Sequence, residues 1–378
     1  MASSSLSSPM MLLLLLLLVC AHAAAANTAG YPAVAGGTGY TRMFSFGDSV
    51  TDAGNLATIA PNSSVTSLPY GQTFFGRPTG RFCDGRLIVD FLAEALGLPL
   101  LTPFLRGKTA DDFRQGANFA VAGATALRQD FFKEMGLDLT IIPPFSLDVQ
   151  LEWFKGVLQM LASTDQERKE IMSKSLFVLG EIGGNDYNHP FFQNRSFTAE
   201  IKPLVPKVVA KIESAIKVLV SLGAKTIVVP GNFPVGCIPM YLTMFENVTD
   251  AKEYDSFGCI KWLNDFSEYH NQQLNRMLHQ IVHDYPTVTI SYVDYYGATL
   301  HITRHPHLYG FERGSVLRAC CGDGGHYNSK SLFSCGLPSS SVCTDPSTYI
   351  SWDGLHLTEA AYKLVAHHML RGLPQPPV

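Results

Sequence analysis

The stretch Met43-Phe44-Ser45-Phe46-Gly47-Asp48-Ser49 combines a short apolar run with a polar turn. Its first four residues predict a buried strand that stops at the glycine. In α/β sheets, catalytic and ligand-binding residues gather at the carboxyl ends of the strands, so Ser49 is a candidate nucleophile. The alternative is that Asp48, Ser49, Thr51 and Asp52 only cap the next helix, because serine, threonine and aspartate are preferred cap residues.

The rest of the chain repeats this change from strand to polar turn to helix. Further short apolar runs begin at Gly116 and lie at 175–179, 226–229 and 287–293, and helical patterns lie at 86–96, 145–161, 201–222, 252–283, 294–304 and 358–373. Strands that alternate with helices predict a mostly parallel sheet covered on both faces. We therefore expect a three-layer α/β/α sandwich. Residues 42–378 form one domain in this interpretation, because no repeat or flexible linker interrupts them.

The amino terminus predicts a secretory signal peptide over residues 1–26. A leucine-dominated run, Met10 to Cys20, precedes Ala21-His22-Ala23, and an apolar core followed by small residues is typical of a cleavable signal. Residues 1–9 hold no lysine or arginine, which departs from the usual pattern. A membrane anchor is the weaker alternative, because about 20 apolar residues are needed to span a bilayer. We expect cleavage between Ala23 and Ala26, then a flexible Gly- and Ala-rich segment over residues 27–41.

Composition and cysteine content agree with a secreted globular protein. The formal net charge of −4 over 378 residues offers no basic surface for nucleic acid, and no basic stripe indicates a membrane-surface helix. Cysteines flanked by Gly, Pro and Ser favour disulfides in an oxidising compartment. We expect Cys237 to pair with Cys259, and the other candidates are Cys320, Cys321, Cys335 and Cys343.

The pairing among those last four cysteines cannot be deduced from the sequence. Once Cys20 is removed with the signal, the number of cysteines is odd, so one of them has no disulfide partner, and we expect this to be Cys83. A zinc site is the rival interpretation, but the spacings do not resemble paired C-x₂-C knuckles. Asn62, Asn194 and Asn247 each begin an N-x-S/T triplet, so they are candidate glycosylation sites on a secreted surface.

A second catalytic candidate precedes the last predicted helix. Asp353 and His356 are three residues apart on a predicted loop, so the carboxylate can hold the imidazole while the imidazole acts as a general base. A serine nucleophile needs such a partner to lose its proton, and Ser49 supplies the other half. The alternative is a loop that caps the helix together with Thr358 and Glu359.

Together these segments resemble the plant GDSL esterase/lipase family of SGNH hydrolases. Four blocks carry the resemblance in the family's order: Phe46 to Ser49, Asn118 to Thr125, Gly183 to Asp186, and Asp353 to His356. The blocks extend over essentially the whole mature chain. The usual Gly-Asp-Ser-Leu reads Gly-Asp-Ser-Val here, and Val50 keeps an apolar side chain.

The resemblance implies the roles of individual residues. Ser49 would be the nucleophile, His356 the base and Asp353 its orienting carboxylate. The oxyanion hole would combine the backbone N–H groups of Ser49 and Gly123 with the Asn185 side-chain amide, and Gly116 is a weaker candidate for the second donor. The resemblance implies an SGNH/flavodoxin-like fold and requires no metal or organic cofactor.

The ester itself is less well defined. The segments 69–71, 180–187 and 320–322 resemble a plant branch that contains sinapine esterase, acetylajmalan esterase and grass cell-wall polysaccharide deacetylases. A secreted enzyme meets cell-wall xylan, so our first expectation is an O-acetyl esterase on xylan or its arabinosyl side chains. The alternatives are an esterase of a small phenolic, alkaloid or lipid ester, and an acyltransferase that uses the same acyl-enzyme. We expect a monomer without nucleic-acid partners or stable membrane insertion, located in the extracellular space, the cell wall or the Golgi lumen.

Two further groups of residues have structural alternatives. His301, His305 and His307 could suggest a metal site, but a surface at the end of a helix is the better interpretation with Arg304 among them. The aromatic-rich segment 70–82 follows the nucleophile block, so it either lines the substrate pocket or packs in the core.

Overall fold

A computed structural model describes residues 39–374 of the chain. The predicted signal peptide and residues 27–38 of the expected flexible segment lie outside this range. Tyr40 and Thr41 already belong to the folded domain, two residues before the predicted boundary. Tyr40 is buried and its hydroxyl donates to the Pro374 carbonyl oxygen at 2.9 Å. The backbone N–H of Thr41 donates to Lys174.

Five parallel strands form the central sheet. They are β1 (Arg42–Phe46), β2 (Gly116–Asn118), β3 (Ser175–Leu179), β4 (Thr226–Pro230) and β5 (Thr289–Val293). Their order in the sheet is β2-β1-β3-β4-β5, and every pairing is parallel. This is the flavodoxin-like order, in which the connections leave β1 and β3 in opposite directions. The predicted fold class is confirmed.

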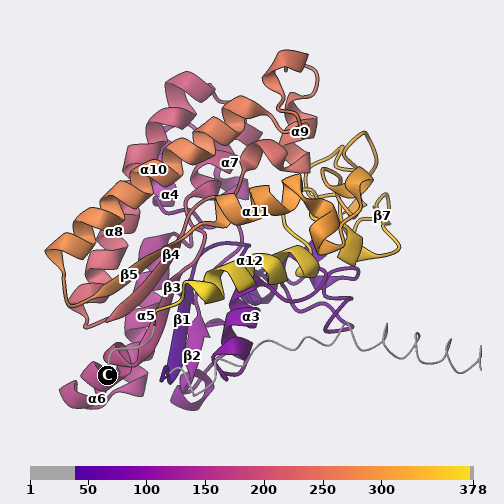
Figure 1. Cartoon of the computed structure of the whole chain (residues 1–378). Coiled ribbons are helices and arrows are strands. Elements are labelled where there is room, and N and C mark those ends of the chain that lie inside the picture. The colour runs from indigo at the N-terminus through magenta and orange to yellow at the C-terminus, as the bar shows by residue number, and fades with distance from the viewer. Residues whose placement is uncertain (1–38, 375–378) are drawn as a thin grey trace, which may run out of the picture. The chain divides into compact units, whose positions relative to one another are not determined.

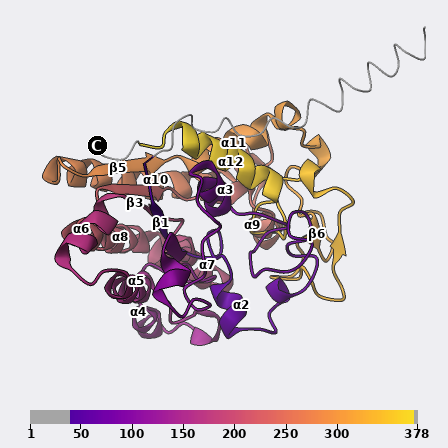
Figure 2. The ribbon, with the colours of Figure 1, turned by 90° about the horizontal axis from the view of Figure 1, so that it is seen from below.

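Helices cover both faces of this sheet. They include α3 (Ile88–Ala95), α5 (Leu147–Leu161), α8 (Val205–Ser221), α10 (Lys261–Asp284), α11 (Tyr295–Arg304) and α12 (Glu359–Arg371). Contacts join α5 to α8 and α8 to α10, and separately α3 to α12 and α12 to α11. Figures 1 and 2 show α3 and α12 on one side of the strands and α5 and α8 on the other.

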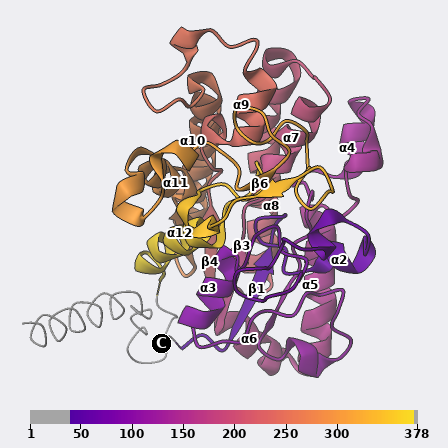
Figure 3. The same cartoon turned by 90° about the vertical axis from the view of Figure 1, so that its right-hand side faces the viewer.

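Further helices lie in the connections. They are α2 (Asn55–Ile59), α4 (Gln129–Glu134), α6 (Asp165–Ser173), α7 (Gly184–Phe192) and α9 (Pro239–Phe245). The loop over residues 318–345, which carries Cys320, Cys321, Cys335 and Cys343, holds only the two-residue strands β6 (Cys321–Gly322) and β7 (Ser341–Val342). Figure 3 shows this loop region beside α9 and α7, above the strands.

Two predicted helices begin later than their apolar patterns suggest. The pattern over 252–283 becomes an α-helix only at Lys261, because Cys259 is tied to Cys237 by a disulfide and Gly258 adopts a φ of +89°. The pattern over 201–222 becomes regular only at Val205, where Pro206 occupies the first turn. Proline is tolerated there because the first-turn N–H groups have no partner within the helix.

Aromatic side chains hold β1 in place beneath the site. Phe44 and Phe46 are fully buried, and the Phe44 ring lies 5.1 Å from Phe154 of α5 and 5.6 Å from Phe177 of β3. The Phe46 ring contacts Phe119, which follows β2, at 5.2 Å. Buried aromatic pairs of this kind contribute about 0.5–1.5 kcal/mol each beyond the burial of their area. The end of β1, and with it Ser49, is therefore fixed against both neighbouring strands and one helix.

All six predicted disulfide cysteines are paired. Cys237 bonds Cys259 as expected, and the group left open resolves as Cys320–Cys343 and Cys321–Cys335. Cys83 is free and buried. A native disulfide typically stabilises a small domain by about 2–4 kcal/mol, so these bonds compensate for the scarce regular structure in the loop.

A buried histidine in α10 leads to a prediction on acid stability. His270 is 1% exposed, its Nδ1 lies 2.7 Å from the Tyr187 hydroxyl, and burial lowers its pKa to about 4. An unfolded histidine titrates near 6.5, so the folded state prefers the neutral ring. This stabilisation is complete above about pH 6.5 and is lost as the pH falls through about 4, with a maximum near 3 kcal/mol.

Replacing His270 by glutamine should therefore flatten the acid side of the stability curve. We expect the free energy of urea unfolding to fall less between pH 7 and pH 4 in His270→Gln than in the unaltered protein. The exposed His279 of the same helix, changed to glutamine, is the matched control and should not flatten the curve. Equal slopes for the unaltered protein and His270→Gln would show that the ring is not held neutral.

Candidate active site

The predicted site residues meet at the carboxyl edge of the sheet. Ser49 follows β1, Gly123 follows β2, and Asn185 lies in the first turn of α7 after β3. Since β1 lies between β2 and β3, these residues surround the point where the strand order reverses. Ligands of open α/β sheets bind in the crevice at this point.

Contacts from distant elements build the turn that carries Ser49. Gly47 adopts a φ of +141°, which side-chain-bearing residues rarely adopt. Its N–H donates to Gln150 Oε1 at 2.9 Å, and its carbonyl accepts from Gln150 Nε2 at 2.8 Å. Asp52 accepts from the backbone N–H groups of 54, 55, 56 and 122. The capping role considered for this stretch therefore belongs to Asp52, and the Ser49 hydroxyl faces elsewhere.

Ser49, His356 and Asp353 form a continuous chain of contacts. His356 Nε2 lies 2.8 Å from Ser49 Oγ, and His356 Nδ1 lies 2.7 Å from Asp353 Oδ2. All three side chains are buried. Asp353 Oδ1 accepts the backbone N–H groups of Leu355 and His356, which fixes the carboxylate plane. The alternative capping role falls to Thr358, whose hydroxyl accepts from the N–H of Ala361.

The environment of Asp353 keeps it ionised. Burial raises the pKa of a carboxyl, but the adjacent His356 and the two backbone N–H groups outweigh burial, and the pKa of Asp353 lies below its usual value. The buried Tyr70 hydroxyl also donates to Asp353 Oδ2, at 2.9 Å. A carboxylate held in this way orients the imidazole and stabilises its protonated form.

Two of the three predicted oxyanion donors are available. Within residues 39–374, the backbone N–H groups of Ser49 and Gly123 donate to no protein acceptor. Gly123 has a φ of +80°, which favours glycine. Gly116 lies inside β2, where a Cβ atom would fall 1.8 Å from the Met43 carbonyl oxygen, so close packing explains that glycine.

The third predicted donor is already engaged. Asn185 Nδ2 lies 2.8 Å from Asp48 Oδ2 and 3.1 Å from the Ala124 carbonyl oxygen, which supplies one acceptor for each of its N–H groups. To bind an oxyanion, the amide has to exchange one of these acceptors for the new one. The sequence did not indicate this arrangement.

A buried acidic pair lies under the nucleophile turn. Burial raises the pKa of Asp48 well above its usual value, and the neighbouring Glu181 raises it further. Burial also raises the pKa of Glu181. Both shifts favour the protonated form, because two carboxyls that share a buried site disfavour a second negative charge. A proton held by the pair lowers the negative charge next to the nucleophile, and with it the repulsion on a developing oxyanion.

A wide groove opens beside Ser49 and Gly123. Its volume is about 320 Å³. Most lining side chains are apolar or aromatic, and the groove is lined by Ser49, Leu56, Ser64, Tyr70, Phe82, Ala122, Gly123, Thr140, Ile141, Pro143, Asn185, His189, Phe192, Phe333, Leu355 and His356. Tyr70 and Phe82 from the aromatic-rich segment take both predicted roles. They line the groove, and they also pack against Trp352 and His356 respectively.

Comparison with known proteins agrees with this geometry. The model of the GDSL-like lipase/acylhydrolase family matches residues 43–369. The chain belongs to this family. A GDSL esterase/lipase of Arabidopsis thaliana is 46% identical over 337 residues, which cover 88% of this chain and 84% of the relative. Sinapine esterase of Brassica napus is 46% identical over 340 residues, 88% of this chain and 86% of the relative. This GDSL hydrolase is accordingly a carboxylic-ester hydrolase.

The remaining predictions concern its surface. Asn62, Asn194 and Asn247 are all exposed, and their glycosylation stays a prediction. His301 and His307 are exposed at the end of α11 and just beyond it, and no cluster of metal-binding side chains occurs within residues 39–374. Of the helices in the same range, none is long and apolar enough to cross a bilayer.

Proposed function

We propose that this GDSL hydrolase cleaves its ester through an acyl-enzyme on Ser49. His356 Nε2 takes the proton as Ser49 Oγ attacks the ester carbonyl, and the tetrahedral oxyanion accepts the Ser49 and Gly123 N–H groups. His356 then protonates the departing alcohol, and a water molecule repeats the sequence to release the acid. The observation that carries this proposal is the contact chain of 2.8 and 2.7 Å from Ser49 through His356 to Asp353.

Covalent labelling tests the nucleophile without knowledge of the natural substrate. We expect diethyl p-nitrophenyl phosphate to release one equivalent of nitrophenol and to leave a diethylphosphoryl group on the peptide that contains Ser49. Peptide mass spectrometry locates the label, and Ser49→Ala should take up none. A label on another serine, with Ser49 unmodified, would refute the assignment.

We further propose an O-acetyl ester of a cell-wall polysaccharide, xylan or its arabinosyl side chains, as the substrate. The groove beside Ser49 is open enough for a bulky alcohol, and a predicted signal peptide together with three disulfides supports secretion towards the wall. Acetate release from a panel of acetylated wall polysaccharides tests this. If no polymer releases acetate while small esters are cleaved rapidly, a polysaccharide substrate is ruled out.

A small phenolic or alkaloid ester is the second candidate. The aromatic lining of the groove, with Phe82, Phe192 and Phe333, suits a flat aromatic group. A relative that is 46% identical carries the name sinapine esterase. Sinapine therefore belongs in the same panel, and faster turnover on it than on acetylated polymers would favour this candidate.

Replacement of Asn185 by alanine tests the third oxyanion donor. We expect kcat to fall by about 10²–10³ with KM almost unchanged, because the amide strengthens its contact only as negative charge develops. Steady-state kinetics on p-nitrophenyl acetate measure this, and the melting temperature controls for damage to α7. A rise in KM at constant kcat would assign Asn185 to ground-state binding instead.

A further inference from the structure

A second, much smaller cavity borders the nucleophile. Its volume is about 50 Å³, compared with about 320 Å³ for the groove. Ser49, Asn185, Leu355 and His356 line both cavities, so the reacting centre lies between them. An ester bound at Ser49 has an acyl part and an alcohol part, and only its smaller part fits the small pocket.

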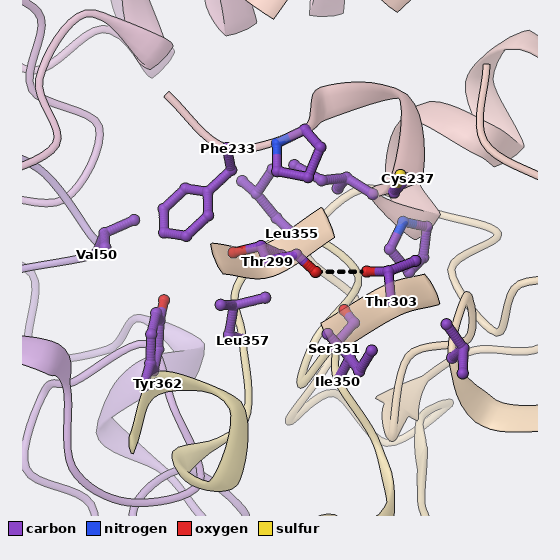
Figure 4. Close-up of a pocket in the computed structure, with 14 residues that line it drawn as sticks. Val50, Phe233, Cys237, Thr299, Thr303, Ile350, Ser351, Leu355, Leu357 and Tyr362 are labelled. Carbon is purple, nitrogen blue, oxygen red and sulfur yellow. Dashed lines mark hydrogen bonds between the residues drawn. The ribbon is translucent and has the colours of Figure 1, made fainter. Parts of the chain in front are cut away.

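A more enclosed cavity of about 40 Å³ lies next to the small pocket. Four apolar side chains line both spaces and form the partition between them: Val50, Phe233, Ile238 and Leu355. In Figure 4 the Phe233 ring lies between Val50 and Leu355. Phe233 follows β4 on the loop and is held against Tyr295, with the ring centroids 5.1 Å apart.

The order of events in the reaction indicates which part of the ester lies where. The alcohol has to leave before water reaches the acyl-enzyme, whereas the acyl group stays on Ser49 until the second step. The wide groove gives the alcohol its way out and the water its way in. The small pocket has a mostly apolar surface, although Asp48, Glu181, Asn188 and Asn232 also line it, and it suits the part that stays.

We propose that the small pocket binds the acyl group and that Phe233 limits this group to a short chain. The inference rests on the proposed acetyl-ester function and adds Phe233 as the side chain that excludes acyl groups much longer than acetyl. Each further methylene has to displace the Phe233 ring, and one methylene too many in a hydrophobic pocket changes kcat/KM by about 10–200-fold. Removal of the ring joins the pocket to the apolar cavity behind it.

The test varies the acyl chain at a constant alcohol. We expect kcat/KM on p-nitrophenyl acetate to exceed that on the hexanoate by about tenfold or more in the unaltered protein. Phe233→Ala should raise the hexanoate-to-acetate ratio by about tenfold or more, and Phe233→Leu should raise it less. If the alanine variant does not fold, the acyl-length ratio of the leucine variant still tests the proposal.

Phe333→Ala is the matched control, because it removes the same side chain from the wide groove. It should leave the acyl-length ratio unchanged. Absence of turnover on every ester by the unaltered protein would count against the proposed function itself. Two results would overturn this inference and leave the hydrolase assignment intact. The protein would hydrolyse esters, but its acyl-length ratio would change in Phe333→Ala, or it would stay the same in both Phe233 variants.

Discussion

Replacement of Ser49 by alanine is expected to lower kcat by about 10⁶, since loss of the nucleophile in a serine protease costs about that factor. The folded state should persist, because within residues 39–374 the Ser49 hydroxyl forms a hydrogen bond only with His356 Nε2 and takes no part in the hydrogen bonds that hold the turn. Turnover of p-nitrophenyl acetate, corrected for spontaneous hydrolysis, measures the loss. Circular dichroism and the melting temperature measure the fold.

His356→Ala and the double variant Ser49→Ala/His356→Ala complete this experiment. The two side chains act as a unit, so the double variant should be about as slow as either single variant. Residual hydrolysis should reflect only binding and the remaining oxyanion donors. Retained turnover in purified Ser49→Ala would eliminate the proposed mechanism, whatever the histidine variant does.

Asp353→Asn is expected to lower kcat by about 10⁴, the factor found when the carboxylate of a serine protease triad becomes an amide. Asp353 Oδ1 accepts two backbone N–H groups, so the amide oxygen of an asparagine would take that position. Its NH₂ group would then face His356 Nδ1. The ring would have to accept there and carry its proton on Nε2, so it could not take the proton of Ser49.

Tyr70→Phe is the control for this variant. The Tyr70 hydroxyl donates to the same Asp353 Oδ2 but does not touch His356 Nδ1, so its loss should cost far less than the amide substitution. Kinetics for both variants on one substrate give the comparison. Equal losses of kcat for Tyr70→Phe and Asp353→Asn would contradict this mechanism. They would mean that Asp353 acts by holding Tyr70 in the aromatic wall of the groove, and not by fixing the tautomer of the His356 imidazole.

The local pattern of the sequence determined the layers of the fold and the candidates Ser49, Asp353 and His356, whereas Gly123 and Asn185 followed from the resemblance to the GDSL family. A strand buried on both faces is a near-continuous apolar run, and the turn after β1 is polar, so both can be recognised over a few residues. Asp353 and His356 can also be recognised within a few residues of sequence, because they lie three residues apart. The apolar pattern predicts a start for α10 that is too early, because the pattern carries no information about the disulfide that restrains Cys259.

Only the tertiary structure decided what surrounds these residues. Gln150 reaches Gly47 from 103 residues away, and Tyr70 reaches Asp353 from 283 residues away, so no spacing in the chain could indicate either contact. The engagement of the Asn185 amide with Asp48 and the two unequal cavities at Ser49 have the same origin. Ser49 and its partners are recognisable from short motifs because each motif is one local turn. The size of the acyl group cannot be recognised from a short motif. Val50, Phe233 and Leu355 come from three separate loops, and they meet only when the sheet has formed.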